Sequence, residues 1–257
     1  MANLRAKKSL GQHFLKDLTA AERMANCLEL QGVEHVLEVG PGTGVLTQYL
    51  LNLNCTLHAI ELDRESIPIL VAKFPSLAQR LHHADLLRWK LPEPLTSEPF
   101  ALVGNYPYNI SSQIVFWMID KRDQIPEMAG MFQREVALRL AADKGSKIYG
   151  VTSVLTQAYY QVDYLFTLDE HAFIPPPRVK SGVIHLRRHA IMPDVPYKDL
   201  ARVVKTAFGL RRKTLRNALK SLTFSNLELF ESFAHLRAEQ LSVADFINLA
   251  KHLSHEN

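Results

Sequence analysis

A glycine-rich loop, Gly40-Pro41-Gly42-Thr43-Gly44, is the feature that most restricts how this chain can fold. It follows a short apolar run at residues 36–39 and precedes a helix-like segment at residues 45–51. Strand, loop and helix in this order are typical of an open α/β sheet. Glycine lets the backbone pass close to a bound molecule where a Cβ atom would collide with it. The loop therefore predicts an α/β fold with a ligand at the end of this strand.

The spacing of the glycines argues against a nicotinamide dinucleotide as that ligand. The Gly-x-Gly-x-x-Gly pattern of such sites needs a further glycine, and Val45 and Thr47 occupy the two positions where it could stand. Acidic residues near the loop also suit a cationic sulfonium nucleoside better than a pyrophosphate.

Two acidic residues follow the next two predicted strands. Glu61 ends the strand at residues 55–60, where a carboxylate in this architecture accepts hydrogen bonds from both ribose hydroxyls. Asp85 ends the third strand and is expected to accept from the amino group of the cofactor's adenine. Each acid considered alone is more often a solvated surface charge.

The segment Val103-Gly104-Asn105-Tyr106-Pro107-Tyr108 leaves a fourth predicted strand through an Asn-x-Pro-aromatic turn. The side-chain oxygen of Asn105 and a backbone carbonyl in the turn can each accept a hydrogen bond from an exocyclic amino group. Pro107 shapes the turn through its fixed φ and donates no competing N–H. Tyr108 offers an aromatic face on which a purine can stack. These properties indicate methyl transfer to N6 of adenine, with Asn105, Pro107 and Tyr108 as the catalytic residues.

The order of these features carries more weight than any one of them. Asn-Tyr-Pro-Tyr alone is equally well explained as an ordinary turn. However, ligands in open α/β sheets bind at the carboxyl ends of strands, so the glycine loop, the two acids and the Asn turn are expected to meet in one crevice. Ser111 and Ser112 are expected to cap the helix that follows, at residues 113–119.

Longer segments are specific enough to indicate a family. The most specific are Lys-Ser-Leu-Gly-Gln-His-Phe-Leu at residues 8–15 and Arg-Arg-Lys-Thr-Leu-Arg-Asn at residues 211–217; others lie at residues 38–44, 103–108, 132–136 and 175–181. Through these segments nearly the whole chain resembles the ribosomal RNA adenine dimethyltransferases. The resemblance is strongest to members that dimethylate two adjacent adenosines near the 3′ end of small-subunit (16S) rRNA.

The resemblance implies a Rossmann-like, S-adenosylmethionine-dependent methyltransferase fold with a small C-terminal helical domain. It implies S-adenosyl-L-methionine as the cofactor, bound or bordered by His13, Leu15, Gly40, Gly42, Glu61, Asp85 and Asn105. His13 replaces an Asn that is common in relatives, and Tyr106 replaces a common Leu; neither change removes a needed acceptor. Phe173 has two equal interpretations: it sandwiches the target base against Tyr108, or it packs in the interior.

Positive charge is concentrated near the C-terminus. Residues 178–220 hold twelve Lys or Arg against Asp194 and Asp199, a net charge of +10, so the rest of the chain sums to about −6. Such a concentration indicates a polyanionic partner, whereas a scattered charge run would indicate a solvated helix face. Lys205, Arg212, Arg216 and Lys220 recur at helical spacing, although Gly209 is expected to interrupt the helix. Arg211, Arg212, Lys213 and Arg216 are the predicted RNA-binding residues, together with Phe173 in its interpretation as a contact of the target base.

The apolar periodicity predicts two domains. With 257 residues and 47% hydrophobic composition, the chain can bury one core and a small satellite domain. An S-adenosylmethionine-binding catalytic domain is expected at residues 1–189. A small helical RNA-binding domain is expected at residues 190–257, after a linker marked by Pro193 and Pro196.

Composition excludes several other classes. No run approaches the roughly 18 apolar residues of a membrane span. Cys27 and Cys55 are isolated and read as reduced residues of a cytoplasmic protein. The histidines lack metal-ligand spacing, so no metal is expected. A monomer is the expected oligomeric state.

The leading hypothesis is dimethylation of N6 on two adjacent adenosines of 16S rRNA, within the small ribosomal subunit or its precursor, with a role in subunit biogenesis. The nearest alternative is a large-subunit rRNA adenine dimethyltransferase of the antibiotic-resistance type. A DNA adenine methyltransferase is disfavoured because no separate target-recognition domain follows the motifs. A non-catalytic ribosome-assembly factor is the alternative from a different class.

Overall fold

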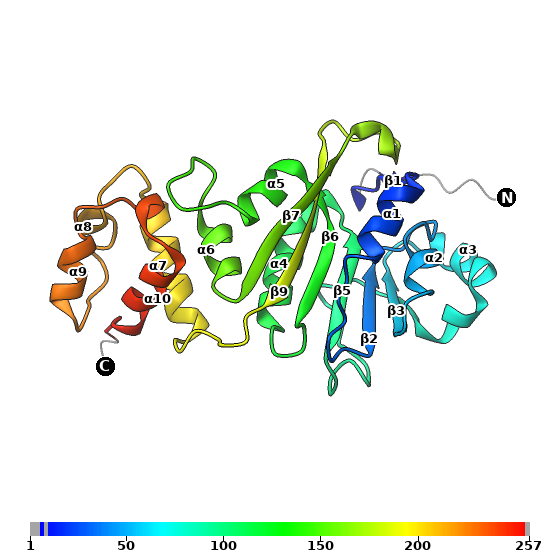
Figure 1. Ribbon diagram of the computed structural model, residues 1–257, viewed down its shortest axis with the longest axis horizontal. Coiled ribbons are helices and arrows are strands. Elements are labelled where there is room, and N and C mark those ends of the chain that lie inside the picture. Colours follow the sequence, from blue (N-terminus) through cyan, green and yellow to red (C-terminus); the bar gives the residue numbers. More distant parts are fainter. Residues whose placement is uncertain (1–5, 8–9, 255–257) are drawn as a thin grey trace. The chain divides into compact units, whose positions relative to one another are not determined.

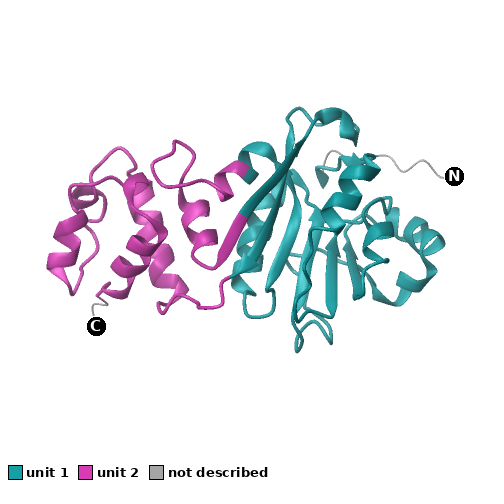
Figure 2. Ribbon diagram, in the orientation of Figure 1, with its two compact units in different colours: residues 1–137, 163–188 teal, residues 138–162, 189–257 magenta. Residues whose placement is uncertain are grey.

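The computed structural model describes residues 6–7 and 10–254. The chain divides into two compact units, residues 1–137 with 163–188 and residues 138–162 with 189–257 (Figure 2). The third and last change of unit, between residues 188 and 189, lies one residue from the domain boundary that the sequence predicts. Residues 138–162, which the sequence places in the first domain, group with the second unit.

A seven-stranded sheet with the strand order β4-β3-β2-β5-β6-β9-β7 carries the first unit (Figure 1). Its strands are β2 (His35–Val39), β3 (Thr56–Glu61), β4 (Leu81–His83), β5 (Phe100–Asn105), β6 (Glu127–Gln133), β7 (Tyr160–Leu168) and β9 (Ser181–Arg188). Strands β4, β3, β2, β5 and β6 run parallel to one another, and β9 is antiparallel to β6. The chain leaves β2 first toward β3 and later returns to β5 on the other side. In open sheets, ligands bind at such a reversal.

The central strands are buried along their length, which explains their nearly continuous apolar sequences. Val36, Leu57, Val103, Met131 and Val183 form part of one hydrophobic core. The helices of this part of the chain are α1 (Leu18–Ala25), α2 (Thr47–Leu50), α3 (Ser66–Lys73), α4 (Ser111–Asp120) and α5 (Arg134–Leu140), with 3-10 turns η2 (Pro75–Arg80), η3 (Tyr108–Ile110) and η4 (Glu170–Ala172). These elements agree with the predicted α/β class.

A short second ribbon brings the N-terminal segment against a distant part of the chain. β1 (Phe14–Leu15) pairs antiparallel with β8 (Phe173–Ile174), so that Leu15 lies opposite Phe173. Leu15 is 5% exposed and Phe173 is 1% exposed, and both belong to the hydrophobic core. The burial of Phe173 favours the packing interpretation over a stack with a target base.

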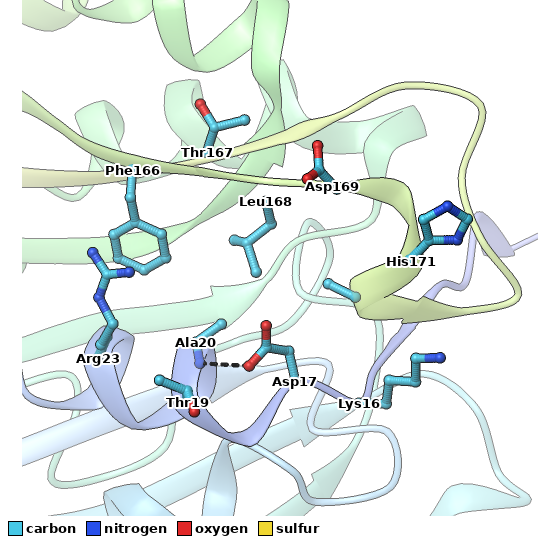
Figure 3. Close-up of a pocket in the computed structure, with 11 residues that line it drawn as sticks. Lys16, Asp17, Thr19, Ala20, Arg23, Phe166, Thr167, Leu168, Asp169 and His171 are labelled. Carbon is cyan, nitrogen blue, oxygen red and sulfur yellow. Dashed lines mark hydrogen bonds between the residues drawn. The ribbon is translucent and has the colours of Figure 1, made fainter.

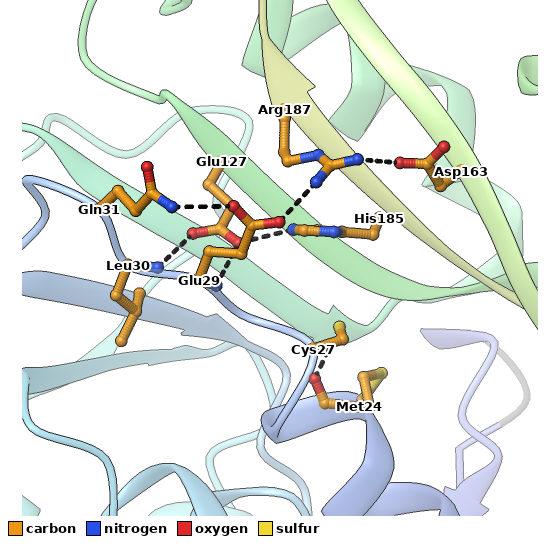
Figure 4. A network of polar contacts seen from close by, with 9 residues as sticks. All are labelled: Met24, Cys27, Glu29, Leu30, Gln31, Glu127, Asp163, His185 and Arg187. Atoms are coloured by element: carbon orange, nitrogen blue, oxygen red, sulfur yellow. Dashed lines mark hydrogen bonds and ion pairs between the residues drawn. The ribbon is translucent and has the colours of Figure 1, made fainter.

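A buried polar network joins the loop between α1 and β2 to the sheet (Figure 4). The carboxylate of Glu127 accepts hydrogen bonds from the amides of Glu29 and Leu30 at 2.7 and 2.9 Å, and from His185 Nε2 at 2.6 Å. Burial alone would raise the pKa of Glu127, but these hydrogen bonds hold that pKa below its usual value. Arg187 extends the network with ion pairs to Glu29 and Asp163, each at 2.5 Å.

The second unit is mostly helical. Its elements are α6 (Val151–Gln157), α7 (Tyr197–Gly209), α8 (Leu215–Ala218), α9 (Leu227–Phe233), η5 (Ala238–Gln240) and α10 (Val243–Lys251). α7 ends at Gly209, as predicted, because glycine weakens a helix. Val204 on α7, and Leu215 and Leu219 at the first residue and the C-cap of α8, are all buried.

None of the helices in the described part of the chain combines the length and hydropathy that a bilayer span requires. Cys27 and Cys55 are free thiols, and burial raises the pKa of both, that of Cys27 to about 12.

Candidate functional site

A cavity of about 360 Å³ opens at the carboxyl ends of the parallel strands. Eight of the residues predicted from the sequence line it: His13, Gly40, Gly42, Glu61, Asp85, Asn105, Pro107 and Tyr108. Register explains the convergence, because Val39 pairs with both Ile60 and Gly104, and Glu61 pairs with His83. Leu15 lines a smaller adjoining cavity, which shares Phe14, Gly40, Gly42 and Asn105 with the first.

The glycine loop has the backbone that its sequence requires. Gly40, Gly42 and Gly44 have φ values of +68°, +56° and +77°, in the left-handed region that favours glycine. A Cβ atom on Gly42 would lie 2.9 Å from the ring of Phe14, and one on Gly44 would lie 2.4 Å from the ring of Phe74. The loop therefore admits no side chain at either position without displacing an aromatic ring.

Glu61 lies at the end of β3 and is 5% exposed. Its two carboxylate oxygens accept hydrogen bonds from the amides of Gly42 at 2.9 Å and Asp63 at 2.8 Å. Each oxygen keeps a second lone pair, so the carboxylate can still accept from two hydroxyls. Burial raises the pKa of Glu61, while the two amide bonds oppose the rise.

Asp85 lies two residues beyond β4 and lines the same cavity. One of its oxygens accepts from the amide of Leu87 at 3.0 Å, and the other faces Arg88 Nε at 3.8 Å. Its side chain is 37% exposed and retains acceptor capacity toward the cavity.

The amide of Asn105 is oriented by the N-terminal segment. Its Nδ2 donates to the backbone carbonyl of His13 at 2.8 Å. Because the donor end is engaged there, the oxygen is the end left to accept from a ligand. The predicted His13 contact with this part of the site is thus made by its backbone, while its ring nitrogen Nδ1 lies 2.8 Å from the Pro175 carbonyl.

Tyr106 has a structural role beneath the turn. It is 1% exposed, and its hydroxyl donates to the Ala129 carbonyl at 3.1 Å. A Cβ atom on Gly130 would lie 2.0 Å from its ring, so Gly130 makes the room that the ring occupies. The Pro107 carbonyl already accepts from the Ile110 amide and from Ser111 Oγ, which makes the Tyr106 carbonyl the better second acceptor.

Ser111 does not cap the helix α4 as the sequence predicts. The helix begins at Ser111 itself, and its hydroxyl donates back to the carbonyls of Pro107 and Tyr108, both at 3.1 Å. A hydroxyl inside the first turn points toward preceding carbonyls rather than toward the free amides of the helix. Ser111 therefore stabilises the turn at residues 105–108.

Tyr108 is held by two contacts that the sequence does not reveal. Its hydroxyl lies 2.6 Å from Ser181 Oγ on β9, and its ring stacks on His13 with 5.4 Å between centroids. Burial raises its pKa. The ring is thus fixed before any base arrives.

The sequence analysis did not assign to the site the residues that hold the N-terminal segment beside the cavity. Leu10, Gly11 and Gln12 line the cavity beside His13. Buried Asp63 accepts from Lys7 Nζ at 2.6 Å and from Gln12 Nε2 at 3.0 Å. The specific motif at residues 8–15 was a sequence signal that the N-terminal segment takes part in the site. No sequence pattern marked Asp63 as its partner.

Glu38 is a second acid that sequence reasoning did not assign to the site. It lines the smaller cavity and is 1% exposed. Burial raises its pKa to about 8, although Thr47 Oγ1 donates to it at 2.7 Å. It is therefore largely protonated at neutral pH.

The predicted RNA-binding residues of the second unit differ in their surroundings. Arg216 forms a two-point ion pair with Glu231, and Arg211 contacts the Ser146 carbonyl at 3.2 Å and Glu239 at 3.8 Å. Arg212 and Lys213 are exposed, and no described residue forms an ion pair with them.

Comparison with known proteins identifies the family. Residues 3–255 match the family model "Ribosomal RNA adenine dimethylase". A protein of Flavobacterium johnsoniae named "Ribosomal RNA small subunit methyltransferase A" is 49% identical over 98% of this chain and 97% of its own length. The structure of a dimethyladenosine transferase from Plasmodium falciparum has a TM-score of 0.80 at 22% identity, covering 92% of this chain and 96% of that one. The 23S rRNA methyltransferase ErmE has a TM-score of 0.70 at 25% identity, covering 93% of this chain and 99% of that one.

The family matched over nearly the whole chain confirms the resemblance found in the sequence, and the structural likeness confirms the methyltransferase fold. The chain belongs to the ribosomal RNA adenine dimethylase family.

Proposed function

We propose that this protein transfers methyl groups from S-adenosyl-L-methionine to N6 of two adjacent adenosines near the 3′ end of 16S rRNA, giving dimethyladenosine at each. One observation carries the proposal: the Asn105 amide is fixed through His13 with its acceptor end free, in the cavity that Gly40, Glu61 and Asp85 also line. The 49% identity to a protein named for the small ribosomal subunit supports that subunit over the large one.

The residues of the cavity fit the cofactor. Glu61 retains a lone pair on each oxygen for the two ribose hydroxyls, and Asp85 can accept from the adenine amino group. Gly40 and Gly42 leave the loop without side chains at the point of closest approach. S-adenosylmethionine bound here supplies an electrophilic methyl group on a sulfonium, so the chain itself need only hold and orient the nucleophile.

The N6 lone pair of adenine is delocalised into the ring, and two acceptors can draw the amino hydrogens toward pyramidal geometry. Asn105 Oδ1 and the Tyr106 carbonyl are the acceptors proposed for this step, and Tyr108 stacks on the purine. Alignment of this kind can remove about 7–11 kcal/mol from a barrier. No strong base is needed, because the proton leaves after attack, when the nitrogen is cationic.

The target base must leave its stack, at a cost of a few kcal/mol. Stacking on Tyr108 returns about 1–3 kcal/mol of that cost. We place rRNA contacts on the second unit, with Arg211, Arg212, Lys213 and Arg216 facing phosphates. The proposed substrate is the small subunit or its precursor in the cytoplasm, with the protein acting as a monomer in subunit biogenesis.

Mass spectrometry tests this function directly. The purified protein, small-subunit particles from cells lacking it and S-adenosylmethionine should yield two adjacent dimethyladenosines in 16S rRNA. Large-subunit particles serve as the matched control and should remain unmodified. Modification of the large-subunit rRNA alone would support the resistance-type alternative, and particle binding without methylation would support the non-catalytic assembly factor.

A further inference from the structure

A second cavity, of about 560 Å³, lies between α1 and the end of β7 (Figure 3). Lys16, Thr19 and Arg23 line one side, and Phe166, Thr167 and His171 line the other. It shares no lining residue with the 360 Å³ cavity that Asn105 lines, hereafter the methyl-transfer cavity. Asp17 and Asp169 also line it, and Phe166 packs partly against the hydrophobic core.

The most specific feature of this cavity is a stacked pair. The guanidinium carbon of Arg23 lies 3.7 Å from the centroid of the Phe166 ring. Arg23 is exposed and Phe166 is half-buried. The ring therefore packs against one face of the guanidinium, and the other face of the guanidinium is open to solvent. A planar guanidinium backed by an aromatic ring is a surface on which nucleic-acid bases stack.

The charges around this pair leave the cations available. Asp17 is engaged as the cap of α1, where it accepts from the Ala20 amide at 3.0 Å. Asp169 is paired with Lys180 at 2.5 Å. By contrast, no described residue forms an ion pair with Lys16 or Arg23. Asp17 keeps its negative charge, so Lys16 and Arg23 together with Asp17 leave a net charge of +1 at the cavity, which favours a phosphate-bearing ligand.

The β1–β8 ribbon links this cavity to the methyl-transfer cavity. His13 lines the first cavity and Lys16 lines the second, and three residues of chain span at most about 10 Å. The Lys16 amide donates to the Ala172 carbonyl at 2.9 Å, which fixes this end of the ribbon. Stacked nucleotides of one strand follow each other at about 3.4 Å, so a few nucleotides cover such a span.

We propose that this cavity is a docking subsite for an unpaired nucleotide of the RNA substrate, a few positions from the adenosine that enters the methyl-transfer cavity. Its base stacks on the Arg23 guanidinium, and Lys16 contacts an adjacent phosphate. The inference rests on the proposed function, since it assigns a second contact to the same substrate.

Three variants of the full-length protein separate stacking from charge. Arg23→Ala should weaken binding of an RNA hairpin with two adjacent loop adenosines by about 5- to 150-fold, the range for loss of one stacked base. Lys16→Ala should reduce the slope of log affinity against log salt by about 0.7, the value for one phosphate on a single strand. Arg23→Lys keeps the positive charge but loses the planar guanidinium. It should therefore retain the wild-type salt slope while binding the hairpin more weakly than wild type.

The control is Lys90→Ala, which removes an exposed charge from the loop between β4 and β5 and lines neither cavity. It should bind the hairpin like wild type, and calorimetry should give the wild-type affinity for S-adenosylmethionine in every variant. Wild-type RNA affinity in Arg23→Ala, or an equal loss in Lys90→Ala, would overturn the subsite. Methylation by the wild-type protein tests the proposed function separately. If the wild type does not methylate the RNA, the proposed function is wrong. If the wild type methylates it and the variants bind RNA normally, only the subsite is wrong.

Discussion

The side chain of Asn105 and the backbone of His13 are joined by a hydrogen bond of 2.8 Å, although 92 residues separate them in the sequence. The bond uses the donor end of the amide, so the N-terminal segment decides which atom of Asn105 faces a ligand. Asn105 is thus an acceptor by virtue of a partner outside its own motif.

Replacing this amide by a carboxylate tests that orientation. Asn105→Asp keeps the shape but loses the donor, and its negative oxygens would repel the His13 carbonyl. We expect kcat for methyl transfer to fall about 100-fold or more, comparable with the loss of one oriented hydrogen bond at a reacting centre. Asn52→Asp, the same change at an exposed position after α2, should leave kcat unchanged. Wild-type turnover in Asn105→Asp would contradict the assigned role.

The Tyr108–Ser181 contact predicts a positioning effect. Ser181→Ala and Tyr108→Phe each remove one partner of the 2.6 Å hydrogen bond, and each should lower kcat/KM for RNA without changing the affinity for S-adenosylmethionine. The expected cost is about 0.5–1.5 kcal/mol. Because both changes break the same bond, the double variant should be little worse than either single variant. Additive losses in the double-mutant cycle would show that the two side chains act independently.

The buried carboxyl of Glu38 predicts a pH dependence of stability. Its pKa rises from 4.5 in the unfolded chain to about 8 in the folded protein, so folding favours the protonated form. This contribution to stability is complete below pH 4.5 and is lost as the pH rises through about 8, with a limiting slope of about 1.4 kcal/mol per pH unit.

Glu38→Gln should therefore unfold with a flatter dependence of free energy on pH across this window, measured by urea denaturation. Glu34→Gln, which changes an exposed acid just before β2, should follow the wild-type profile. Parallel profiles for wild type and Glu38→Gln would refute the protonated state of Glu38.

The basic residues of the second unit should contribute unequally to RNA binding. Arg216 is paired with Glu231, whereas no described residue pairs with Arg212 or Lys213. The double change Arg212→Ala and Lys213→Ala should reduce the salt slope of RNA binding by about 1.4, since two phosphates lose their partners. Arg216→Ala should change the slope less, because Glu231 already offsets its charge. An equal or larger effect from Arg216→Ala would place the RNA contact on α8.

Much of the proposed methyl-transfer site was predictable because its residues follow a rule of sequence order. Glu61 and Asn105 end their strands, Gly40 and Asp85 follow theirs within two residues, and parallel strands bring their carboxyl ends to one edge of a sheet. The order of motifs along the chain therefore predicts that these residues line one cavity. The interruption of the C-terminal helix at Gly209 was likewise readable from one residue.

Other features depended on contacts between distant segments, for which no local pattern exists. The Ser181 contact with Tyr108 spans 73 residues, and the Asp63 contact with Lys7 spans 56. Phe173 had two equal interpretations until pairing with β1 placed it in the core. The grouping of residues 138–162 with the second unit was not visible in their composition.

By itself, then, the sequence determined the fold class, the family and the residues at the strand ends, because periodicity, glycine spacing and motif order are properties of neighbouring positions. Only the tertiary structure decided which end of the Asn105 amide is free, which cations remain unpaired and whether Glu38 carries a proton. Those properties depend on burial and on partners far along the chain, and both exist only once the strands have found their register.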